Sequence, residues 1–423
     1  MDMFKKISVI GLGYIGLPTA AMFASRGYEV VGVDINSETV EIINQGDIHI
    51  VEPDLDSVVR DVVVNGNLRA CLDPEPADVF IITVPTPFCL EKNSSDIPEP
   101  DLSYINAATK AIAPILKAGN LVILESTSPV GTTESIAELL AKYRPDLSFP
   151  QMLGDESDVR IAYCPERVLP GNIMEELVTN DRIIGGLSEA CSTITASLYK
   201  TFVLGECIIT NSRTAEMSKL TENSCRDVQI AFANELSVIC DELDINVWEL
   251  IDLANRHPRI DILKPGPGVG GHCIAVDPWF IVNNSPQHAK LIKTARLVNN
   301  EKPKWVLNKF KVAVADYLQD NCSKNVGDIT VACYGLAFKA DIDDLRESPA
   351  NSIAHEIISS HAGDVLVVEP NIEQLPDGHL AERLAPLEEA LELADIHVML
   401  VDHKEFKDHR PKSGFIIDTR GIW

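Results

Sequence analysis

Cys273 is the residue of this sequence whose surroundings most favour chemistry, because it directly follows a glycine- and proline-rich run, PGPGVGGH, at positions 265–272. Glycine lets main-chain N–H groups approach a ligand that a Cβ atom would block, and a thiolate is a strong nucleophile. The run therefore favours a nucleophilic thiol held against a ligand. By itself it leaves open an inert, buried cysteine beside a tight turn.

Three polar side chains fall on one face of a predicted long helix. Lys219, Asn223 and Arg226 occupy positions i, i+4 and i+7 in a stretch without glycine or proline that spans residues 215–243. A cation and an amide in such a row can stabilise a developing oxyanion, and Lys219 can also handle a proton. The alternative for the row is a solvated polar helix face.

A glycine-rich turn lies between a strand and a helix near the N-terminus. Residues 7–10, ISVI, form a mostly apolar strand, and GLGYIG follows at 11–16. A helical pattern comes next, and a second strand at 29–33 is followed by Asp34. In a βαβ unit the first glycine of G-x-G-x-x-G permits a tight turn, the second lets the backbone approach a pyrophosphate, and the third lets helix and strand pack closely. These roles fall to Gly11, Gly13 and Gly16.

Asp34 is placed to accept hydrogen bonds from an adenosine ribose, and its charge would repel a 2′-phosphate. We therefore expect the cofactor to be NAD rather than NADP, although a strand-terminal turn residue is the alternative for Asp34. The loops at 85–87 and 125–131 follow further predicted strands. Thr86 and Thr127 in these loops are candidates for cofactor contacts, unless their hydroxyls only bond local backbone.

Oxidation of an alcohol beyond the aldehyde needs a nucleophilic thiol, groups that stabilise an oxyanion and a nicotinamide cofactor. Cys273, the polar side chains on the predicted helix and the glycine-rich turn together offer these. An aldehyde readily gives up a second hydride only after it becomes tetrahedral. We expect Cys273 to form a thiohemiacetal, which a second NAD⁺ oxidises to a thioester that water hydrolyses. Asp277, four residues later, could orient or activate that water, although Asp277-Pro278-Trp279 is also a good helix start.

The elements that must position these residues begin with an α/β pattern. Strands at 79–84 and 121–124 alternate with helices at 102–117 and 132–142, which indicates a parallel, doubly wound sheet. The next part of the sequence has the pattern of long helices. Beyond the stretch at 215–243, a second helical pattern covers residues 287–317, and we expect Pro303 to interrupt it.

The α/β pattern returns after a polar linker at 321–328, but without a G-x-G-x-x-G. We predict strands at 329–334, 364–368, 397–401 and 415–417, and helices at 349–360 and 386–394. The expected fold class is α/β, with two Rossmann-like doubly wound domains joined by a central helical region. The expected domains are residues 1–210, 211–320 and 321–423.

The composition indicates which classes of binding partner and which cellular compartment are expected. The chain has 423 residues, 45% hydrophobic and 23% charged, with a formal net charge of −27. Without a Lys/Arg run, this charge argues against a nucleic acid or an anionic membrane as partner. The ten cysteines form no Cys-x-x-Cys pair, which argues against a disulfide framework or a zinc site, so we expect a cytoplasmic protein without a metal.

These motifs together resemble the UDP-glucose/UDP-mannose dehydrogenase family of NAD-dependent four-electron oxidoreductases. The resemblance extends over nearly the whole chain. It rests on the N-terminal fingerprint, STSPVG at 126–131, YCPERVLPG at 163–171, Lys219 with Asn223, NRHPR at 255–259, GGHCIAVDPW at 270–279 and RESP at 346–349.

The resemblance implies roles for individual residues. It implies that Tyr14, Ile15, Asp34, Thr86 and Thr127 bind NAD, and that Glu166 lies near the hydrolytic water. Nucleotide-sugar contacts would come from Arg167, Val168, Lys219, Asn223, Arg226 and Gly270, with Lys339 and Arg346 on the UDP side. His257 and Arg259, which we expect Pro258 to hold in an extended segment, would reach the partner's site in a homodimer.

Within the family, Val276 just before the aspartate of the cysteine loop disfavours UDP-glucose, because that branch usually has lysine there. The resemblance implies oxidation of UDP-N-acetyl-D-mannosamine to its uronate with two NAD⁺ and one water, for capsule, O-antigen or enterobacterial common antigen synthesis. The alternatives are a 6-dehydrogenase of UDP-N-acetylglucosamine, UDP-glucose or another nucleotide sugar, a two-electron hydroxyacid dehydrogenase, and a non-catalytic NAD and nucleotide-sugar sensor.

Overall fold

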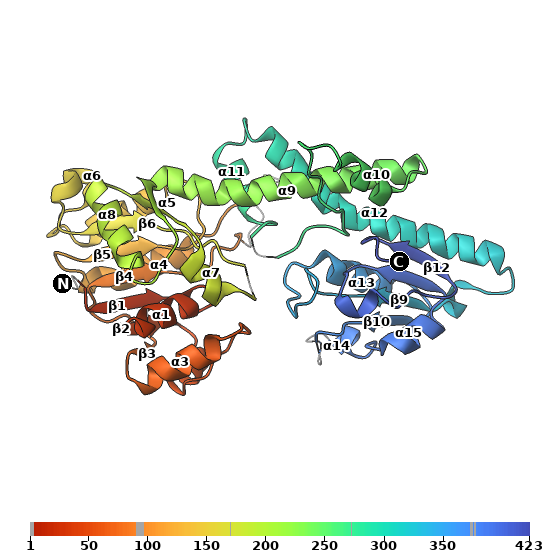
Figure 1. Cartoon of the computed structure of the whole chain (residues 1–423), viewed down its shortest axis with the longest axis horizontal. Helices are drawn as coiled ribbons and strands as arrows, with labels where there is room; N and C mark the ends of the chain where they lie inside the picture. The colour runs from red at the N-terminus through yellow and green to blue at the C-terminus, as the bar shows by residue number, and fades with distance from the viewer. Residues whose placement is uncertain (1–3, 90–96, 170, 272, 373–374, 376–377) are drawn as a thin grey trace. The chain divides into compact units, whose positions relative to one another are not determined.

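A computed structural model describes residues 4–89, 97–169, 171–271, 273–372, 375 and 378–423. The chain divides into two compact units (Figure 1). The first unit comprises Met1–Glu222 and Trp279–Asn284, and the second comprises Asn223–Pro278 and Ser285–Trp423. His272, next to the candidate nucleophile, and Pro170 of the YCPERVLPG motif lie outside the described residues.

An eight-stranded sheet forms the centre of the first unit. Its strands are β1 (Lys6–Ile10), β2 (Glu29–Val33), β3 (Leu68–Cys71), β4 (Val79–Ile82), β5 (Leu121–Leu124), β6 (Arg160–Tyr163), β7 (Arg182–Gly186) and β8 (Cys207–Asn211). They are ordered β3-β2-β1-β4-β5-β6-β7-β8, and β6 and β7 form the one antiparallel pair among them. The first six follow the order of dinucleotide-binding folds.

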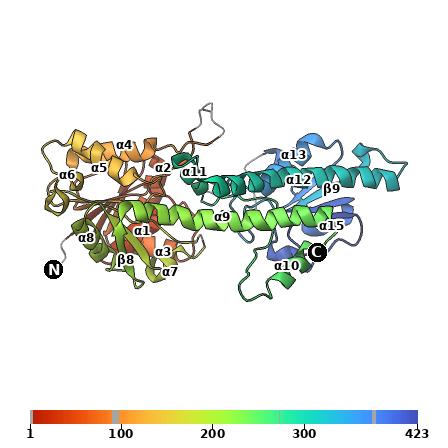
Figure 2. The same cartoon turned by 90° about the horizontal axis from the view of Figure 1, so that it is seen from above.

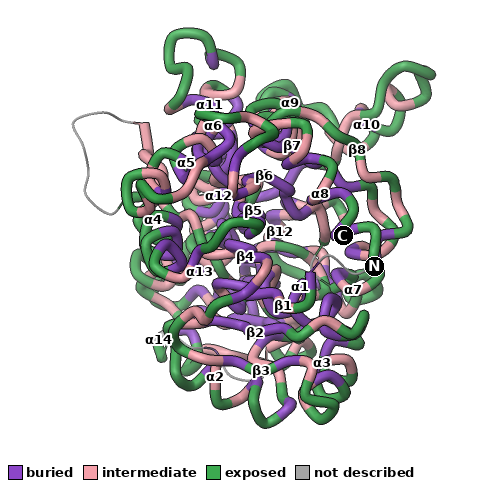
Figure 3. The backbone as a smooth tube through the Cα atoms, turned by 90° about the vertical axis from the view of Figure 1, so that its left-hand side faces the viewer, coloured by how far each residue is buried: buried purple, intermediate pink, exposed green. Residues whose placement is uncertain are grey.

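Helices cover both faces of this sheet. The helices and 3₁₀ turns are α1 (Gly16–Ser25), α2 (Ser37–Asn44), α3 (Leu55–Val64), α4 (Ser103–Ile112), η1 (Ala113–Ile115), α5 (Thr132–Tyr143), α6 (Pro150–Leu153), η2 (Gly154–Glu156), α7 (Ile173–Thr179) and α8 (Glu189–Tyr199). One core gathers α1, α3, α7 and α8, and a second gathers α4 and α5. Strands β1, β2 and β4 are mostly buried between them, as expected for a parallel sheet covered on both sides (Figure 3).

Two long helices and two short ones make up the middle of the chain. The long ones are α9 (Ser212–Glu242) and α12 (Lys290–Asp320), and the short ones are α10 (Val247–Ala254) and α11 (Asp277–Asn284). In the second unit, α12 lies beside the part of α9 that begins at Asn223 (Figure 2). The prediction that Pro303 interrupts the second helix was wrong, because α12 continues through it. A proline removes one helical hydrogen bond, and burial of the apolar side chains of Val306 and Phe310 on the same helix offsets that loss.

A four-stranded parallel sheet forms the rest of the second unit. Its strands, in the order β10-β9-β11-β12, are β9 (Val331–Tyr334), β10 (Val365–Val368), β11 (Ile396–Met399) and β12 (Phe415–Asp418). The surrounding elements are η3 (Val326–Asp328), α13 (Pro349–Ser360), α14 (Gly378–Ala381), α15 (Leu387–Leu393) and η4 (Lys404–Phe406). The predicted fold class, two Rossmann-like sheets and a helical region, is confirmed.

Candidate active site

The glycine-rich turn after β1 has the geometry that the fingerprint predicts. Gly11 has φ of +95°, and a Cβ atom there would lie 2.9 Å from the carbonyl oxygen of Thr83. A Cβ atom at Gly16 would lie 1.8 Å from the carbonyl oxygen of Gly11. At Gly13, by contrast, a Cβ atom would meet nothing within 4 Å. Gly11 and Gly16 therefore shape the turn, while Gly13 exposes backbone where a pyrophosphate could approach α1.

Asp34 is held against this turn. Its Oδ2 accepts the N–H of Leu12 at 2.9 Å, and its Oδ1 accepts the N–H of Asn36 at 2.9 Å. A carboxylate has about four lone-pair positions, so both oxygens can accept further hydrogen bonds. Tyr14 and Ile15, at the entrance to α1, are partly buried. The arrangement suits a ribose hydroxyl pair beside a diphosphate.

Thr86 and Thr127 lie at neighbouring strand ends and are joined to each other. The hydroxyl of Thr86 donates to the carbonyl of Thr127 at 2.7 Å. Both residues are half-buried. The Thr86 hydroxyl is thus engaged with local backbone, and it can still accept a hydrogen bond from a ligand.

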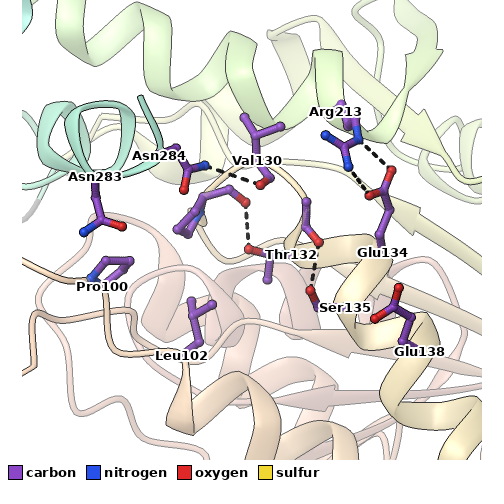
Figure 4. A pocket seen from close by; sticks show the side chains of 12 residues that line it. Pro100, Leu102, Val130, Thr132, Glu134, Ser135, Glu138, Arg213, Asn283 and Asn284 are labelled. Atoms are coloured by element: carbon purple, nitrogen blue, oxygen red, sulfur yellow. Dashed lines mark hydrogen bonds and ion pairs between the residues drawn. The ribbon is translucent and has the colours of Figure 1, made fainter. Parts of the chain in front are cut away.

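A pocket of about 390 Å³ opens beyond the same loop (Figure 4). Its lining includes Val130, Thr132 and Asn284, and the Nδ2 of Asn284 donates to the carbonyl of Val130 at 3.4 Å. An ion pair between Arg213 and Glu134 borders it. The predicted cofactor residues do not line this pocket.

Glu166 is a buried carboxylate. It is 6% exposed, and its Oε2 lies 2.6 Å from Nη1 of Arg182, which is itself 2% exposed. Arg167, the next residue, forms a bidentate pair with Glu222, with distances of 3.1 and 2.8 Å. Val168 is partly buried against the core around α1. Sequence position alone indicated only a loop carboxylate for Glu166.

The structure brings Asn223, Asp277 and the Cys273 loop together. Asn223 on α9 donates from Nδ2 to Oδ2 of Asp277 at 2.5 Å. The carbonyl of Cys273 accepts the N–H of Asp277 at 2.9 Å, and Cys273 is exposed. The alternative of a buried cysteine is therefore excluded. Lys219 lies one turn before Asn223 on α9 and is half-buried.

The glycines before Cys273 approach protein backbone. A Cβ atom at Gly270 would lie 2.5 Å from the carbonyl oxygen of Glu347, and Gly271 has φ of +81°. The N–H of Gly271 donates to the carbonyl of Arg346 at 3.3 Å. The loop can therefore pack against residues 346–349 only because it lacks side chains there.

Three predicted substrate cations are exposed: Arg226, His257 and Arg259. The prediction that Pro258 holds its segment extended was wrong. The N–H of Ile260 donates to the carbonyl of His257 at 3.0 Å, which closes a turn with Pro258 at its second position. The fixed φ of proline suits that turn position as well as an extended strand.

Lys339 and Arg346 are both exposed in the loop after β9. Arg346 forms a bidentate pair with Asp344, with its Nη2 at 2.7 Å from Oδ2. At the equivalent of Asp34, Glu369 follows β10 and accepts the N–H of Leu336 at 2.7 Å. Each sheet thus has its own acidic residue in the same position. Asp34 binds the loop after β1, and Glu369 binds the loop after β9.

One group of potential metal ligands, Asp341, His403 and Glu405, occurs in the described part of the chain. Nδ1 of His403 accepts the N–H of Asp341 at 2.9 Å, and its Nε2 lies 3.2 Å from Oε2 of Glu369. Both ring nitrogens are therefore engaged in hydrogen bonds, which leaves the imidazole without a free lone pair for a metal.

Sequence models of the UDP-glucose/GDP-mannose dehydrogenase family match three successive parts of the chain. Its NAD binding domain matches residues 5–203, its central domain residues 213–301, and its UDP binding domain residues 332–423. The chain belongs to this family. NAD is accordingly the cofactor, as predicted, and the geometry around Gly13 and Asp34 fits it.

Individual members of the family are similar over almost their full length. A UDP-N-acetyl-D-mannosamine dehydrogenase from Yersinia pestis is 61% identical over 99% of both chains. An NDP-N-acetyl-D-galactosaminuronic acid dehydrogenase from Ralstonia nicotianae is 58% identical over 99% of this chain and 96% of its own. The solved structure of a UDP-D-ManNAc dehydrogenase from Pyrococcus horikoshii is 39% identical, with a TM-score of 0.85 over 99% of this chain and 96% of its own.

Two buried residues beside Glu166 were not predicted from the sequence. Glu125 follows the apolar strand β5, and Arg182 begins the apolar strand β7. A charged residue next to a buried strand is the signal that could have identified each of them. Nothing in the spacing of the sequence predicts that they meet.

Proposed function

We propose that this protein oxidises UDP-N-acetyl-D-mannosamine to UDP-N-acetyl-D-mannosaminuronate, using two NAD⁺ and one water per turnover. The observation that carries the proposal is the assembly of an exposed Cys273 with Asp277 and Asn223. A thiol followed by a paired carboxylate suits covalent capture of an aldehyde and later hydrolysis. The 61% identity to the Yersinia enzyme over 99% of both chains supports UDP-N-acetyl-D-mannosamine as the substrate.

The cofactor residues act by binding and orientation. Bound NAD⁺ supplies the acceptor for both oxidations. Gly11, Gly13 and Gly16, with Tyr14 and Ile15, form the diphosphate turn at the start of α1. Asp34 holds the adenosine ribose and disfavours NADP⁺ through its charge. Thr86 and Thr127 contact the cofactor from the ends of neighbouring strands.

The reaction residues divide the work between covalent and electrostatic roles. Cys273 adds to the aldehyde and carries the thioester. Lys219 and Asn223 stabilise the oxyanions, and Lys219 exchanges a proton with the alcohol. Asp277 and Glu166 orient the hydrolytic water and move its proton. The hydrogen bond between Asn223 and Asp277 supports this assignment because it fixes the orientation of both side chains.

The nucleotide sugar is held by cations and by backbone. Arg167, Val168, Arg226 and Gly270 contact it, and Lys339 and Arg346 neutralise its diphosphate. We propose a homodimer in which His257 and Arg259 reach the partner's site. Their exposure supports this role, as do the exposed apolar side chains Phe232, Leu243 and Leu253 on α9, just after it and on α10.

We propose that the protein works in the cytoplasm, with three domains at 1–210, 211–320 and 321–423, and supplies an acidic sugar for a bacterial surface polysaccharide. The structure describes all ten cysteines, and none of them forms a disulfide, which suits a reducing compartment. No helix in the described residues has both the length and the apolar character to cross a membrane.

The experiment counts NADH formed per UDP-N-acetyl-D-mannosamine consumed. We expect two NADH for the wild type, and loss of full turnover for Cys273→Ser. Cys322→Ser is the matched control, because Cys322 is also exposed. A ratio of one NADH, or an active Cys273→Ser variant, would refute the thioester route.

The same assay with other sugars tests the choice of substrate. UDP-N-acetylglucosamine, UDP-glucose and UDP-N-acetylgalactosamine are compared by kcat/KM, the last because of the 58% identity to the Ralstonia enzyme. A higher kcat/KM for any of these would move the assignment to that sugar. Binding of NAD and UDP-sugars without any NADH formation would identify a sensor instead.

A further inference from the structure

Two buried carboxylates share one buried arginine in the first unit. Glu125 is 2% exposed, Glu166 6% and Arg182 2%. Nη1 of Arg182 lies 2.6 Å from Oε2 of Glu166 and 3.6 Å from Oε1 of Glu125. If all three were ionised, the cluster would bury one uncompensated negative charge, which is costly. It is therefore more stable with one proton on a carboxylate.

Burial and the longer distance to Arg182 favour Glu125 as the proton carrier, while two hydroxyl groups donate to its ionised form. Its Oε1 accepts the hydroxyl of Tyr199 at 2.5 Å, and its Oε2 accepts that of Thr19 at 3.3 Å. The pKa of Glu125 is raised to about 7, because burial and the charge of Glu166 raise it more than Arg182 and the two hydroxyl groups lower it. Glu166, in contrast, has the closer contact with Arg182.

Two further titratable groups beside Glu125, a thiol and a phenol, are neutral near pH 7. Burial raises the pKa of the Cys164 thiol, at the end of β6, and that of the Tyr199 phenol on α8 well above their ordinary values. Arg182 stays charged and lies over the ring of Tyr199, with its Cζ 5.0 Å from the centroid. Glu125 is thus the neighbour of Glu166 whose charge changes near neutral pH.

The contact between Arg182 and Glu166 depends on charge. Neither Arg182 Nη1 nor Glu166 Oε2 makes a hydrogen bond with the described residues, so the 2.6 Å contact is an ion pair without hydrogen-bond geometry. Such a contact responds directly to a third charge nearby. Ionisation of Glu125 would both compete for Arg182 and repel the Glu166 carboxylate.

We propose that Glu125 and Arg182 are positioning residues that set the basicity of Glu166 in the hydrolytic step, which rests on the function proposed above. In that step water attacks the thioester carbon, the bond from carbon to the Cys273 sulfur breaks, and Glu166 passes the water proton to the leaving thiolate. The products are the uronic acid and the free thiol. When Glu125 is protonated, Arg182 interacts with Glu166 alone, which makes Glu166 a weaker base. When Glu125 is ionised, it competes for Arg182 and repels the Glu166 carboxylate, which makes Glu166 a stronger base.

The test measures how fast acyl-Cys273 disappears as a function of pH. The acyl-enzyme is formed with UDP-N-acetyl-D-mannosamine and NAD⁺, free ligands are removed, and its decay is followed by mass spectrometry of the intact protein. For the wild type we expect the rate to rise through about pH 7. Glu125→Gln should abolish that inflection and decay about threefold more slowly than the wild type at high pH.

A second variant reports the direction of the effect. Tyr199→Phe keeps the ring beneath Arg182 but removes the hydroxyl that stabilises ionised Glu125, so the inflection should move to higher pH. If Glu125→Gln fails to fold, Tyr199→Phe alone still tests whether Glu125 causes the inflection. Glu134→Gln removes the charge of a partly exposed carboxylate of the same unit and should match the wild type.

The outcomes separate the two proposals. Absence of acyl-Cys273 in the wild type would refute the proposed function. Formation of acyl-Cys273 with the same inflection in the wild type, Glu125→Gln and Tyr199→Phe would overturn the role of Glu125 and leave the proposed function standing.

Discussion

Asn223 and Asp277, 54 residues apart in the sequence, are joined by a hydrogen bond of 2.5 Å between Nδ2 and Oδ2. Asp277 is only 3% exposed, and it is the first residue of α11, directly after the Cys273 loop. A buried carboxylate needs a donor, because burial without one is costly. The bond therefore fixes the position of Asp277 and ties the cysteine loop to α9.

Asp277→Asn separates the charge of this residue from its position. The asparagine carbonyl can still accept from Asn223, so we expect the fold to be retained. Because positioned acids and bases contribute about 10²- to 10⁴-fold, kcat should fall at least about 100-fold. Steady-state NADH formation and near-ultraviolet circular dichroism measure the two effects. A variant with wild-type kcat would show that Asp277 serves only as a structural link.

Asp34→Asn tests the cofactor assignment. The variant retains an acceptor for the N–H of Leu12 or Asn36 but removes the charge. We expect KM for NAD⁺ to rise about tenfold and the ratio of NADP⁺ to NAD⁺ turnover to increase, since repulsion of a 2′-phosphate is lost. Asp47→Asn, an exposed carboxylate in the same unit, is the control. An unchanged cofactor ratio would contradict the role of Asp34.

Glu125→Gln should change how stability depends on pH. Burial raises the pKa of Glu125 from 4.5 to about 7, so the folded state holds this proton more tightly than the unfolded chain does. The wild type therefore loses stability as pH rises from 4.5 to about 7, and the loss is complete above that. The variant escapes this loss, so we expect it to be equally stable at low pH and more stable by about 3 kcal/mol at high pH.

Urea unfolding of both proteins at several pH values measures this difference, with the transition of the first unit followed separately where two are resolved. Equal stability of wild type and variant across the whole range would contradict the raised pKa of Glu125.

Arg296→Met should destabilise the second unit. Arg296 on α12 is 3% exposed, and its Nη1 lies 2.6 Å from Oδ1 of Asp227, which is fully buried. Removing one partner leaves a buried charge without compensation, which costs about 3 to 5 kcal/mol. The double variant Asp227→Asn/Arg296→Met removes both charges and should recover much of that loss, as a double-mutant cycle would measure. Additive losses would contradict the coupling.

Local patterns were sufficient to predict most elements. Apolar runs at β1, β2, β4 and β5 are continuous, because strands of a covered parallel sheet are buried on both faces. Predictions failed where a residue permits two conformations. Pro303 lies inside a helix whose apolar side chains are buried, and Pro258 lies in a turn that the hydrogen bond between His257 and Ile260 closes.

The sequence by itself determined the glycine turn, the acidic residue that ends β2 and the spacing of Lys219, Asn223 and Arg226, since each depends on neighbours within one or two elements. It also identified Cys273. Only the tertiary structure decided that Asn223 meets Asp277, that the glycine loop packs on residues 346–349, and that Arg182 lies between Glu125 and Glu166. These contacts join residues far apart in the chain, and the packing of strands and helices, which no local pattern encodes, brings them together.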